Sequence, residues 1–456
     1  MWNVRDKKFL VLGLARSGFA VANLLIDHGA KVTASDMGQG DSVMQDAKSL
    51  EMRGVRVVLG GHPFSLLDGV DLVVKNPGIR YDVPIIAAAI QRGIRVVTEI
   101  EVASRFTDSP IVAITGSNGK TTTTTLIGEM FTASRIPAVV SGNIGTALSG
   151  VIQDLAKETW LVTEVSSFQL QGTEEFHPKV SVLLNVYPTH LDYHGSMESY
   201  MQAKLRIFAN QHDGDVAILN WDKDNVRALV PQLQIQGVDV RGFSVRGQVE
   251  KGLYALDGKI YYRYAGDEPA IEVCPVHDVA LRGEFNLENA LAAGAAALAA
   301  GISLDAVARV WRVFQGVEHR MEFVRTVNQV KYYNDSKATN PQAAIRAIHS
   351  FQEPEIVILG GLERGDDLTP LVDPLRKHAK AVVVLGESAE RMREVAVQAE
   401  IRTIRSVHTL EEAVSTAVGL AETGDVVLLS PAAASWDMFP SFEVRGRIFK
   451  EAVHKL

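Results

Sequence analysis

A lysine and five threonines follow a glycine turn in the stretch from Val112 to Gly128, VAITGSNGKTTTTTLIG. Glycines let backbone N–H groups approach an anion closely, and a lysine and a hydroxyl at a helix start suit phosphate groups and Mg²⁺. Gly116 and Gly119 lie two residues closer together than the glycines of the common phosphate loop GxxxxGK[ST]. The apolar run before the turn and the helical pattern after it still predict a nucleotide-phosphate site at Lys120, rather than an ordinary turn without a ligand.

A second glycine turn lies near the N-terminus, where the apolar run Phe9–Leu12 is followed by Gly13-Leu-Ala-Arg-Ser-Gly18 and a helical pattern. The next run, Lys31–Asp36, ends in an acid eighteen residues after Gly18. A strand, a glycine turn, a helix and a strand ending in an acid form the first unit of a nucleotide-binding fold. Ala15 replaces the second glycine of that pattern, so a tight turn without a ligand remains an alternative interpretation.

The elements that position these turns alternate between strands and helices in three blocks, at residues 1–98, 99–316 and 317–456. Strands are predicted at Asp71–Val74, Ile94–Val97, Ile111–Ile114, Trp160–Val165, Val180–Asn185, Val216–Asn220, Lys331–Asn334, Glu355–Leu359, Ala381–Leu385 and Asp425–Leu429. Helices are predicted at Met197–Ala209 and Asn286–Ala300, with a β-rich insertion at Gly252–Glu272. Alternation throughout predicts an α/β protein with parallel, doubly wound sheets and ligands at the carboxyl ends of strands.

The composition excludes several classes of partner. The 456 residues are 46% apolar and 22% charged, with a net charge of −8, which favours neither nucleic acid nor an anionic membrane. Cys274 is the only cysteine, so a reducing compartment is expected. No apolar run approaches the roughly 20 residues that span a bilayer, and we expect no cleavable signal at the N-terminus. A cytoplasmic protein without membrane insertion is the expectation.

The compact loop TGSNGKTT resembles the signature of the Mur ligase superfamily, the ATP-dependent amide ligases of cell-wall precursor and folate-polyglutamate synthesis. Further stretches match the family in order over almost the whole chain: TEVSSFQL (163–170), LLNVYPTHLDYH (183–194), GEFNLENALAA (283–293), HRMEFV (319–324), NDSKATNP (334–341), LGGLERGDD (359–367) and LLSPAAASWDMF (428–439). The resemblance implies a Rossmann-like N-terminal domain that binds a UDP-substrate, a central P-loop ATPase-type domain and a Rossmann-like C-terminal domain.

The resemblance also assigns roles at the phosphate loop. By its motifs, ATP is bound by Gly116, Ser117, Asn118, Gly119, Lys120, Thr121, Thr122, Asn286, Asn289, Arg320 and Asp335, with His319 also near the nucleotide. The resemblance implies a catalytic set of Lys120, Glu164, His190 and Lys204. Two Mg²⁺ ions are expected to be bound by Thr121, Glu164, His190 and Lys204. In this family the lysine that matches Lys204 is carbamylated. His190, Asp192 and His194 imitate a metal triad, but only His190 matches the motif, and the other two are expected at the surface or in support.

Two stretches, NDSKATN and SPAAASWDMFPSFEVRG, look most similar to the branch of the superfamily that adds D-glutamate to UDP-N-acetylmuramoyl-L-alanine. That similarity implies a UDP-substrate site at Arg16, Ser17, Asp36, Asn76, Asn143, Ser166 and His190, and a D-glutamate site at Lys337, Thr339, Arg364, Ser435 and Phe442. Two positions depart from the family pattern. Many members of this branch have lysine at the position of Arg364, and some have an apolar residue at the position of Arg16.

The expected reaction is an amide ligation that forms ADP through an acyl phosphate, carried out by a monomer. A folylpolyglutamate-type ligase is an alternative, but such enzymes lack a separate glycine-turn domain like residues 1–98. A P-loop ATPase without ligation chemistry would have no need of the NDSKATN and SPAAAS stretches. A NAD-dependent dehydrogenase would account for the first glycine turn and leave the second block unexplained.

Overall fold

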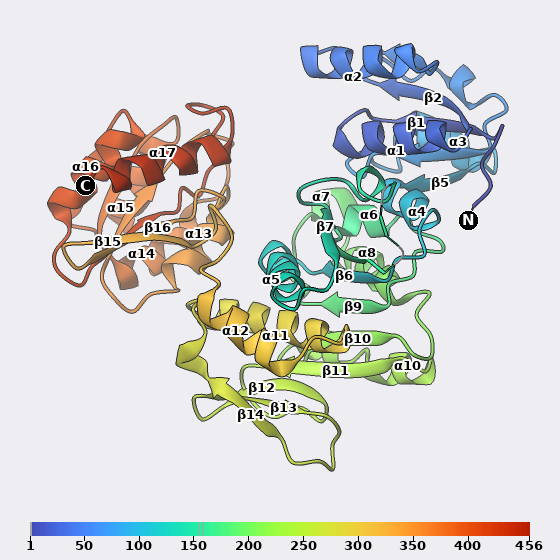
Figure 1. Ribbon diagram of the computed structural model, residues 1–456. Coiled ribbons are helices and arrows are strands. Elements are labelled where there is room, and N and C mark those ends of the chain that lie inside the picture. The colour runs from blue at the N-terminus through green and yellow to red at the C-terminus, as the bar shows by residue number, and fades with distance from the viewer. Residues whose placement is uncertain (1, 154, 157) are drawn as a thin grey trace. The chain divides into compact units, whose positions relative to one another are not determined.

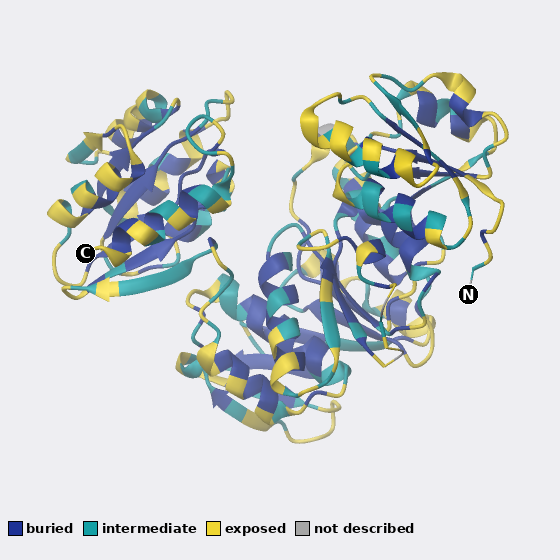
Figure 2. Cartoon of the chain, turned by 45° about the horizontal axis from the view of Figure 1, so that its top comes forward, coloured by how far each residue is buried: buried dark blue, intermediate teal, exposed yellow. Residues whose placement is uncertain are grey.

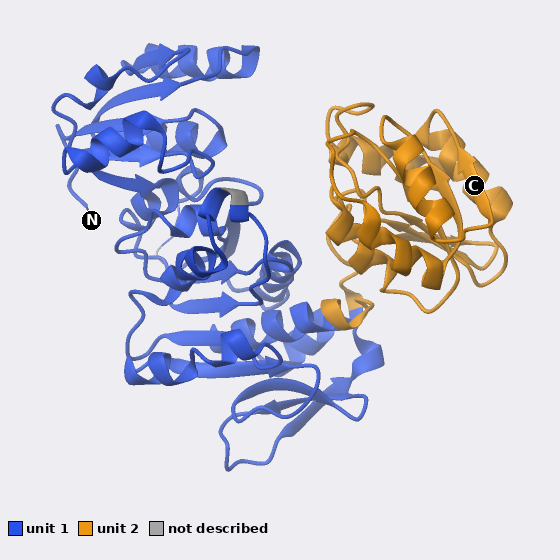
Figure 3. Cartoon of the chain, turned by 180° about the vertical axis from the view of Figure 1, so that it is seen from behind, with its two compact units in different colours: residues 1–279, 287–312 blue, residues 280–286, 313–456 orange. Residues whose placement is uncertain are grey.

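The computed structural model describes residues 2–153, 155–156 and 158–456, which form two compact units. The first unit contains residues 1–279 and 287–312, and the second contains residues 280–286 and 313–456 (Figure 3). The first unit holds a five-stranded sheet and a nine-stranded sheet, and the second holds a six-stranded sheet. The block boundaries after residues 98 and 316 stay predictions. None of the helices in the described residues is long and apolar enough to cross a membrane.

The five-stranded sheet has the strand order β3-β2-β1-β4-β5, and all its pairs are parallel (Figure 1). Its elements are β1 (Lys8–Leu12), α1 (Arg16–Asp27), β2 (Lys31–Asp36), α2 (Asp41–Met52), β3 (Arg56–Leu59), a 3-10 turn (Phe64–Leu67), β4 (Leu72–Lys75), α3 (Pro84–Gln91), β5 (Arg95–Thr98) and α4 (Glu99–Ser104). Alternate residues of β1 face opposite cores: Phe9 packs with the helices α1 and α2, and Leu10 packs with α3. The order reverses at β1, where open α/β sheets bind ligands.

The nine-stranded sheet has the order β14-β13-β12-β11-β10-β9-β6-β8-β7. Its elements are β6 (Ile111–Thr115), α5 (Lys120–Ala133), β7 (Ala138–Gly142), β8 (Trp160–Glu164), α6 (Ser167–Leu170), β9 (Val180–Leu183), α7 (Leu191–His194), α8 (Met197–Leu205), β10 (Val216–Asn220), α9 (Asp224–Arg227), α10 (Val230–Ile235), β11 (Asp239–Ser244), β12 (Gly252–Leu256), β13 (Lys259–Arg263), β14 (Ile271–Pro275), α11 (Glu284–Ala299) and α12 (Leu304–Val313). The strand β6 lies between β8 and β9, so the ends of these three strands meet at one edge.

The sheet of the second unit has the order β15-β16-β20-β17-β18-β19. Its elements are β15 (Glu322–Val327), β16 (Val330–Asn334), α13 (Pro341–Ile348), β17 (Glu355–Leu359), α14 (Val372–His378), β18 (Ala379–Val384), α15 (Ala389–Gln398), β19 (Thr403–Ser406), α16 (Leu410–Leu420), β20 (Val426–Leu429) and α17 (Phe442–His454). One face of the sheet packs with α13, α14 and α15, and the other packs with α16 and α17. Figure 2 shows the central strands of this sheet as buried, whereas the edge strand β15 is partly exposed.

The α/β fold with parallel sheets is confirmed, and three strands add antiparallel pairs at the ends of two of the sheets. The strands β13 and β14 continue the central sheet in antiparallel pairs, and β15 pairs antiparallel with β16. Two-residue turns explain two of these pairs: Asp257 and Gly258 have φ values of 50° and 75°, and Asn328 and Gln329 have 49° and 63°. Two successive residues with positive φ make the tight turn that joins antiparallel neighbours, whereas a parallel crossover needs a longer connection.

The helix predicted at Met197–Ala209 ends earlier than expected. The α-helix α8 stops at Leu205, and a 3-10 turn covers Arg206–Phe208. The carbonyl of Ile207 accepts a 3.1 Å hydrogen bond from the buried hydroxyl of Ser181, so the last turn is held by the sheet. The helical periodicity of the sequence could not predict this tertiary hydrogen bond.

The helix α4 connects the first two sheets and is bonded to the segment after α6. The carboxylate of Glu101 accepts hydrogen bonds from the backbone N–H groups of Glu174, Glu175 and Phe176, at 2.8 to 3.1 Å. The backbone N–H of Thr98 donates to the carbonyl of Gly172 at 3.0 Å. These bonds fix the N-terminal sheet to the central sheet within the first unit.

The first glycine turn requires glycine at Gly18 because the helix α1 passes close to the turn. A Cβ atom at Gly18 would lie 1.8 Å from the carbonyl oxygen of Gly13. We therefore expect Gly18→Ala to lower the free energy of unfolding of this domain by about 1–3 kcal/mol, measured by denaturant or thermal unfolding. Gly61→Ala is the matched control, since a Cβ there meets no atom within 4 Å. Equal stability of the two variants would contradict the close approach.

Candidate functional site

The phosphate loop lies between the carboxyl end of β6 and the first turn of α5. Gly119 has a φ of 84°, and a Cβ atom there would lie 2.1 Å from the Oδ1 atom of Asn289. The N–H of Ser117 donates to the carbonyl of Asn185 at 2.9 Å, and the N–H of Asn118 donates to the Oδ1 atom of Asn185 at 3.0 Å. Asn185 thus shapes the loop, a role that the sequence analysis did not assign although the residue lies in a matched motif.

A hydroxyl, a carboxylate and an amide meet directly behind this loop. The hydroxyl of Thr121 donates to the Oε2 atom of Glu164 at 2.8 Å, and the Nδ2 of Asn143 donates to the Oε1 atom at 2.8 Å. Glu164 is 2% exposed and ends the strand β8, next to β6 in the sheet. The structure therefore brings three residues predicted from separate motifs into one hydrogen-bonded group. Hydroxyl and carboxylate oxygens are the hard donors that Mg²⁺ prefers.

Two lysines contact the same carbonyl in the loop. The Nζ atoms of Lys120 and Lys204 each lie 2.9 Å from the carbonyl oxygen of Gly116. Lys204 is 1% exposed and its Nζ lies 4.7 Å from the ring centre of Tyr200. Burial first, and the charge of Lys120 second, hold the pKa of Lys204 well below its usual value, although Glu164 acts in the opposite sense. A buried lysine of this kind readily exists as a neutral amine.

His190 is the N-cap residue before the helix α7, has a φ of 57° and lies among aromatic rings. Its ring centre is 5.0 Å from that of Phe168 and 6.4 Å from that of Tyr200. His194 is buried, and its Nε2 atom lies 3.0 Å from the hydroxyl oxygen of Ser167. Of the two expectations for His194, a supporting position fits and a surface position is wrong. The side chain of Asp192 lies outside the described residues.

The N-terminal candidates gather at the carboxyl ends of β1, β2 and β4. The carboxylate of Asp36 accepts the N–H groups of Leu14 and Gly38, both at 2.6 Å. The Nδ2 atom of Asn76 donates to the hydroxyl of Ser17 at 3.2 Å. Asp36 and Asn76 thus hold the glycine turn after β1 in place through Leu14 and Ser17, whether or not they contact a ligand.

Arg16 and Ser166 lie toward the central sheet. The guanidinium of Arg16 donates to the carbonyl of Gly145 at 3.1 Å, two residues beyond Asn143. Arg16 therefore connects the N-terminal turn with the loop that carries Asn143. Ser166 caps the helix α6 by accepting the N–H of Gln169 at 3.2 Å, so part of its hydrogen-bonding capacity supports the fold.

In the second unit, His319 and Asp335 are held by buried partners. The Nδ1 atom of His319 lies 2.9 Å from the Nδ2 atom of Asn334. Asp335 accepts the hydroxyl of Ser430 at 2.9 Å and the N–H of Met321 at 3.1 Å. Burial raises the pKa of Asp335 to about 6, although these hydrogen bonds and the nearby charge of Arg320 act to lower it.

The candidates for the amino-acid site lie beyond the carboxyl ends of β16, β17 and β20, which are neighbours in the sheet, and Phe442 begins the helix α17. These are Lys337 and Thr339 after β16, Arg364 after β17, and Ser435 and Phe442 after β20. The Nζ of Lys337 lies 5.5 Å from the ring centre of Phe442. The guanidinium carbon of Arg364 lies 4.6 Å from the ring centre of Trp436, which is 65% exposed.

Arg445, which the sequence analysis did not assign, connects two of these loops. Its guanidinium donates to the hydroxyl and carbonyl of Ser336, at 3.0 and 2.8 Å, and to the carbonyl of Ala433 at 3.1 Å. Burial lowers the pKa of Arg445 to about 10. Asn286 lies in the second unit and donates to the carbonyl of Arg282 at 2.8 Å, whereas Asn289 lies in the first unit beside Gly119.

A buried lysine that the sequence analysis missed lies between the N-terminal and central sheets. Lys75 is 1% exposed, and its Nζ donates to the carbonyls of Ile79 and Pro77 at 2.9 and 3.3 Å and to the hydroxyl of Tyr193 at 3.2 Å. The ring centre of Tyr81 lies 4.5 Å away. Burial lowers the pKa of Lys75 from 10.5 to about 7. A sequence pattern that could have predicted this burial is a lysine at the end of an apolar strand, directly before Asn-Pro-Gly.

We predict that Lys75→Met stabilises the protein relative to the wild type in a pH-dependent way. Below pH 7 the wild-type lysine is protonated in both states, and the folded state carries the full cost of a buried charge. Between pH 7 and 10.5 only the unfolded state holds the proton, so wild-type stability rises with pH. Because each pKa unit corresponds to about 1.4 kcal/mol, the gain from methionine is a few kcal/mol at pH 6 and vanishes near pH 10.5.

Thermal unfolding of the full chain between pH 6 and pH 10 measures this difference. The hydroxyl of Tyr193 lies 3.1 and 3.0 Å from the carbonyl oxygens of Pro77 and Ile79, so its one proton keeps one of these acceptors paired in the variant. Lys48→Met, at an exposed position of α2, is the control for losing a lysine side chain. A difference between Lys75→Met and wild type that stays constant with pH would refute the buried charge as its cause.

Comparisons with known proteins cover nearly the whole chain. Residues 7–98 match the Mur ligase MurD-like N-terminal domain, residues 114–297 the Mur ligase middle domain, and residues 319–433 the Mur ligase glutamate ligase domain. The UDP-N-acetylmuramoylalanine–D-glutamate ligase of Geobacillus sp. (strain WCH70) is 46% identical over 99% of this chain and 98% of its own. The enzyme of that name from Bacillus thuringiensis (strain Al Hakam) is 45% identical over the same shares.

Solved structures share the fold at low sequence identity. UDP-N-acetylmuramate–alanine ligase from Thermotoga maritima is 19% identical, with a TM-score of 0.56 over 98% of this chain and 99% of its own. MurF from Acinetobacter baumannii is 18% identical, with a TM-score of 0.58 over 98% of this chain and 92% of its own.

Proposed function

Because the chain belongs to the Mur ligase family, we propose that it is an ATP-dependent ligase that joins D-glutamate to UDP-N-acetylmuramoyl-L-alanine in peptidoglycan precursor synthesis. Similarity over 99% of the chain to ligases that bear this name is the observation that carries the proposal. The local geometry agrees with it. The loop at Lys120, the hydroxyl of Thr121 and the carboxylate of Glu164 together suit a nucleotide triphosphate and its divalent ion.

Amide formation from a carboxylate needs activation, because an amine does not displace oxide. We propose that an oxygen of the L-alanyl carboxylate attacks the γ-phosphorus of ATP, so that ADP leaves and an acyl phosphate forms. The amine of glutamate then attacks the carbonyl carbon, phosphate leaves and the nitrogen loses a proton. Negative charge grows on the phosphoryl and carboxyl oxygens, and Lys120 at the start of α5 is placed to stabilise it.

The nucleotide-sugar substrate is proposed to extend from the N-terminal turn to the phosphate loop. Arg16, Ser17, Asp36 and Asn76 lie at the end that would receive the uridine diphosphate. Asn143, Ser166 and His190 lie at the end that would receive the reacting carboxylate. The Arg16–Gly145 hydrogen bond supports this arrangement because it brings the two groups of residues to neighbouring loops.

Thr121, Glu164, His190 and Lys204 are proposed to hold two Mg²⁺ ions, which would supply positive charge for phosphoryl transfer. As an amine, Lys204 donates hydrogen bonds and offers no oxygen ligand. We propose that it is carbamylated: the neutral amine attacks CO₂, a nitrogen–carbon bond forms and a proton leaves. Burial and the lowered pKa of Lys204 support this, because a protonated amine has no lone pair for the attack.

The second unit is proposed to bind ATP through His319, Arg320 and Asp335 and the amino acid through Lys337, Thr339, Arg364, Ser435 and Phe442. Asn286 and Asn289 are proposed to lie near the adenine. Lys337 and Arg364 are cations at one sheet edge, which suits a substrate with two carboxylates. The domain limits 1–98, 99–316 and 317–456, a cytoplasmic location and a monomeric state belong to the same proposal.

A phosphate-release assay with UDP-N-acetylmuramoyl-L-alanine and ATP tests the function. We expect phosphate release to require the nucleotide substrate and D-glutamate, with L-glutamate, D-alanine, L-lysine and diaminopimelate poor. A site built for two carboxylates rejects D-alanine and L-lysine, which lack the second carboxylate, and it leaves the additional ammonium of L-lysine and diaminopimelate unpaired. The preference for D over L rests on the relatives alone. Substrate labelled with ¹⁸O in the L-alanyl carboxylate should transfer one label to phosphate. Unlabelled phosphate would refute the acyl phosphate, and faster coupling of L-lysine or diaminopimelate would refute the D-glutamate assignment.

We predict that Lys204→Ala lowers kcat on the order of 100-fold or more, because the proposed carbamate oxygens are lost from the metal site. Short carboxylic acids added to the variant should restore part of the activity, since they supply oxygen ligands. Gln202→Ala, at an exposed position of the same helix, is the matched control and should keep wild-type activity. Full activity of Lys204→Ala, or a free amine on Lys204 in the active wild type by intact mass, would contradict the carbamate.

A further inference from the structure

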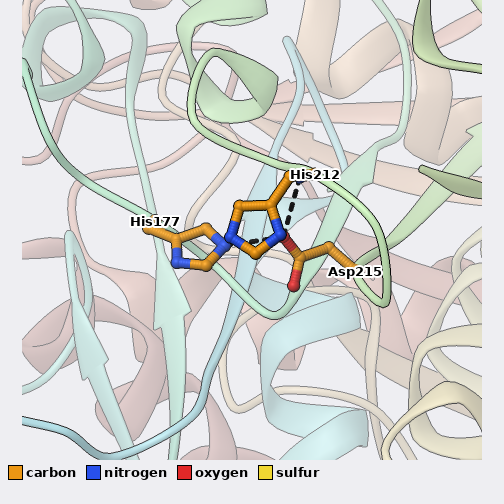
Figure 4. A group of neighbouring side chains, drawn as sticks. All are labelled: His177, His212 and Asp215. Atoms are coloured by element: carbon orange, nitrogen blue, oxygen red, sulfur yellow. Dashed lines mark hydrogen bonds and ion pairs between the residues drawn. The ribbon is translucent and has the colours of Figure 1, made fainter. Parts of the chain in front are cut away.

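A cluster of metal-ligating side chains lies at the amino ends of two central strands. His177 precedes β9, and His212 and Asp215 precede β10 (Figure 4). One ligand atom from each of the three residues lies within 4.8 Å of the others. The four residues of β9 separate this edge of the sheet from the phosphate-loop edge by about 13 Å. The cluster is therefore separate from the site proposed for ligation.

Asp215 is the buried anion of this cluster, with a side chain that is 0% exposed. Its Oδ2 atom lies 2.6 Å from the Nε2 of His177 and accepts the backbone N–H of His212 at 2.9 Å. Its Oδ1 atom accepts Lys179 at 3.2 Å. Burial raises the pKa of Asp215, but the hydrogen bonds from His177, the His212 backbone and Lys179 outweigh it, so the pKa lies below its usual value.

The two imidazoles cover this carboxylate from the solvent side. Their ring centres lie 4.7 Å apart, and the Nδ1 atom of His212 lies 3.7 Å from the Oδ2 atom of Asp215. The side chains of His177 and His212 are 38% and 67% exposed, so an ion can reach the cluster from water. Two imidazoles and one carboxylate, with the fourth direction open to water, form a donor set typical of Zn²⁺ and unlike the all-oxygen sets of Mg²⁺.

We propose that His177, His212 and Asp215 bind one divalent ion of the Zn²⁺ class at this edge of the central sheet. His177 would ligate through Nε2, which now lies 2.6 Å from the Oδ2 atom of Asp215, and carry its ring proton on Nδ1. His212 would ligate through Nδ1, which now lies 3.1 Å from the carbonyl of Asp213, and carry its proton on Nε2. Lys179 remains on the other carboxylate oxygen, and its charge weakens binding.

The ion would cross-link two segments that already contact each other. Gln211, next to His212, donates through Nε2 to the carbonyls of Pro178 and Val216, both at 3.1 Å. A bound ion would add a second connection between the segments that lead into β9 and β10. Because an ion that binds only the folded state stabilises it by mass action, the expected role is structural.

Calorimetric titration of the full chain with Zn²⁺, in buffer that contains saturating Mg²⁺, tests the site. We expect one Zn²⁺ to bind and the unfolding temperature to rise with Zn²⁺. His177→Gln and His212→Gln should each weaken binding on the order of tenfold or more, since one of three protein ligands is lost. Lys179→Gln should bind Zn²⁺ at least as tightly as the wild type. The histidine variants are used instead of an Asp215 variant, because removing the buried carboxylate would also disturb the fold.

A second histidine pair provides the matched control. The ring nitrogens of His349 and His378 lie 3.3 Å apart at an exposed place in the second unit. His378→Gln should leave the Zn²⁺ affinity unchanged. Failure of the wild type to bind Zn²⁺ at micromolar concentration would overturn the proposal. Affinities for Zn²⁺ that are equal in wild type, His177→Gln and His212→Gln would also overturn it, because the ion would then lie elsewhere.

Discussion

The Nζ atoms of two lysines contact one carbonyl oxygen, and this contact is the constraint around which the central site is built. Lys120 and Lys204 both lie 2.9 Å from the Gly116 oxygen, and the carboxylate of Glu164 acts on Lys204 from nearby. Two like charges this close together are costly unless one is neutral or anions surround them. The lowered pKa of Lys204 favours its neutral amine. The start of the helix at Lys120 favours a bound anion. A neutral Lys204 and an anion bound near Lys120 both suit a site that accepts phosphate.

The strand orders explain how distant motifs reach that site. The strand β6 has β8 on one side and β9 on the other, so Thr115, Glu164 and Leu183 end three adjacent strands. In the second unit β20 lies between β16 and β17, and the loops after these three strands carry the candidates for the amino-acid site. The carboxyl edge of a parallel sheet therefore assembles each group of residues, while hydrogen bonds such as Thr121–Glu164 set their orientation.

Much of this arrangement could be predicted from sequence, because the strands are apolar runs and each candidate phosphate-binding element follows one of them. The glycine turn at Gly116–Gly119 and the acid at Glu164 were visible as residue types at strand ends. Local patterns did not predict the two-residue hairpin turns at Asp257 and Asn328, because the alternation of strands and helices along the sequence does not indicate which strands pair. Lys75 was also missed, since its burial depends on Tyr81 and Tyr193, which approach it only in the folded chain.

The bonds between α4 and the segment after α6 have a consequence for ligands that occupy both ends of the first unit. The three N–H groups on Glu101 and the bond from Thr98 to Gly172 hold the N-terminal glycine turn and the loop before α5 at one separation. Two weak fragments, one seated at each end and joined by a linker of matching length, would therefore have a high effective concentration for each other. A linker that is too short would gain nothing, because the protein between the two ends is bonded at a fixed span.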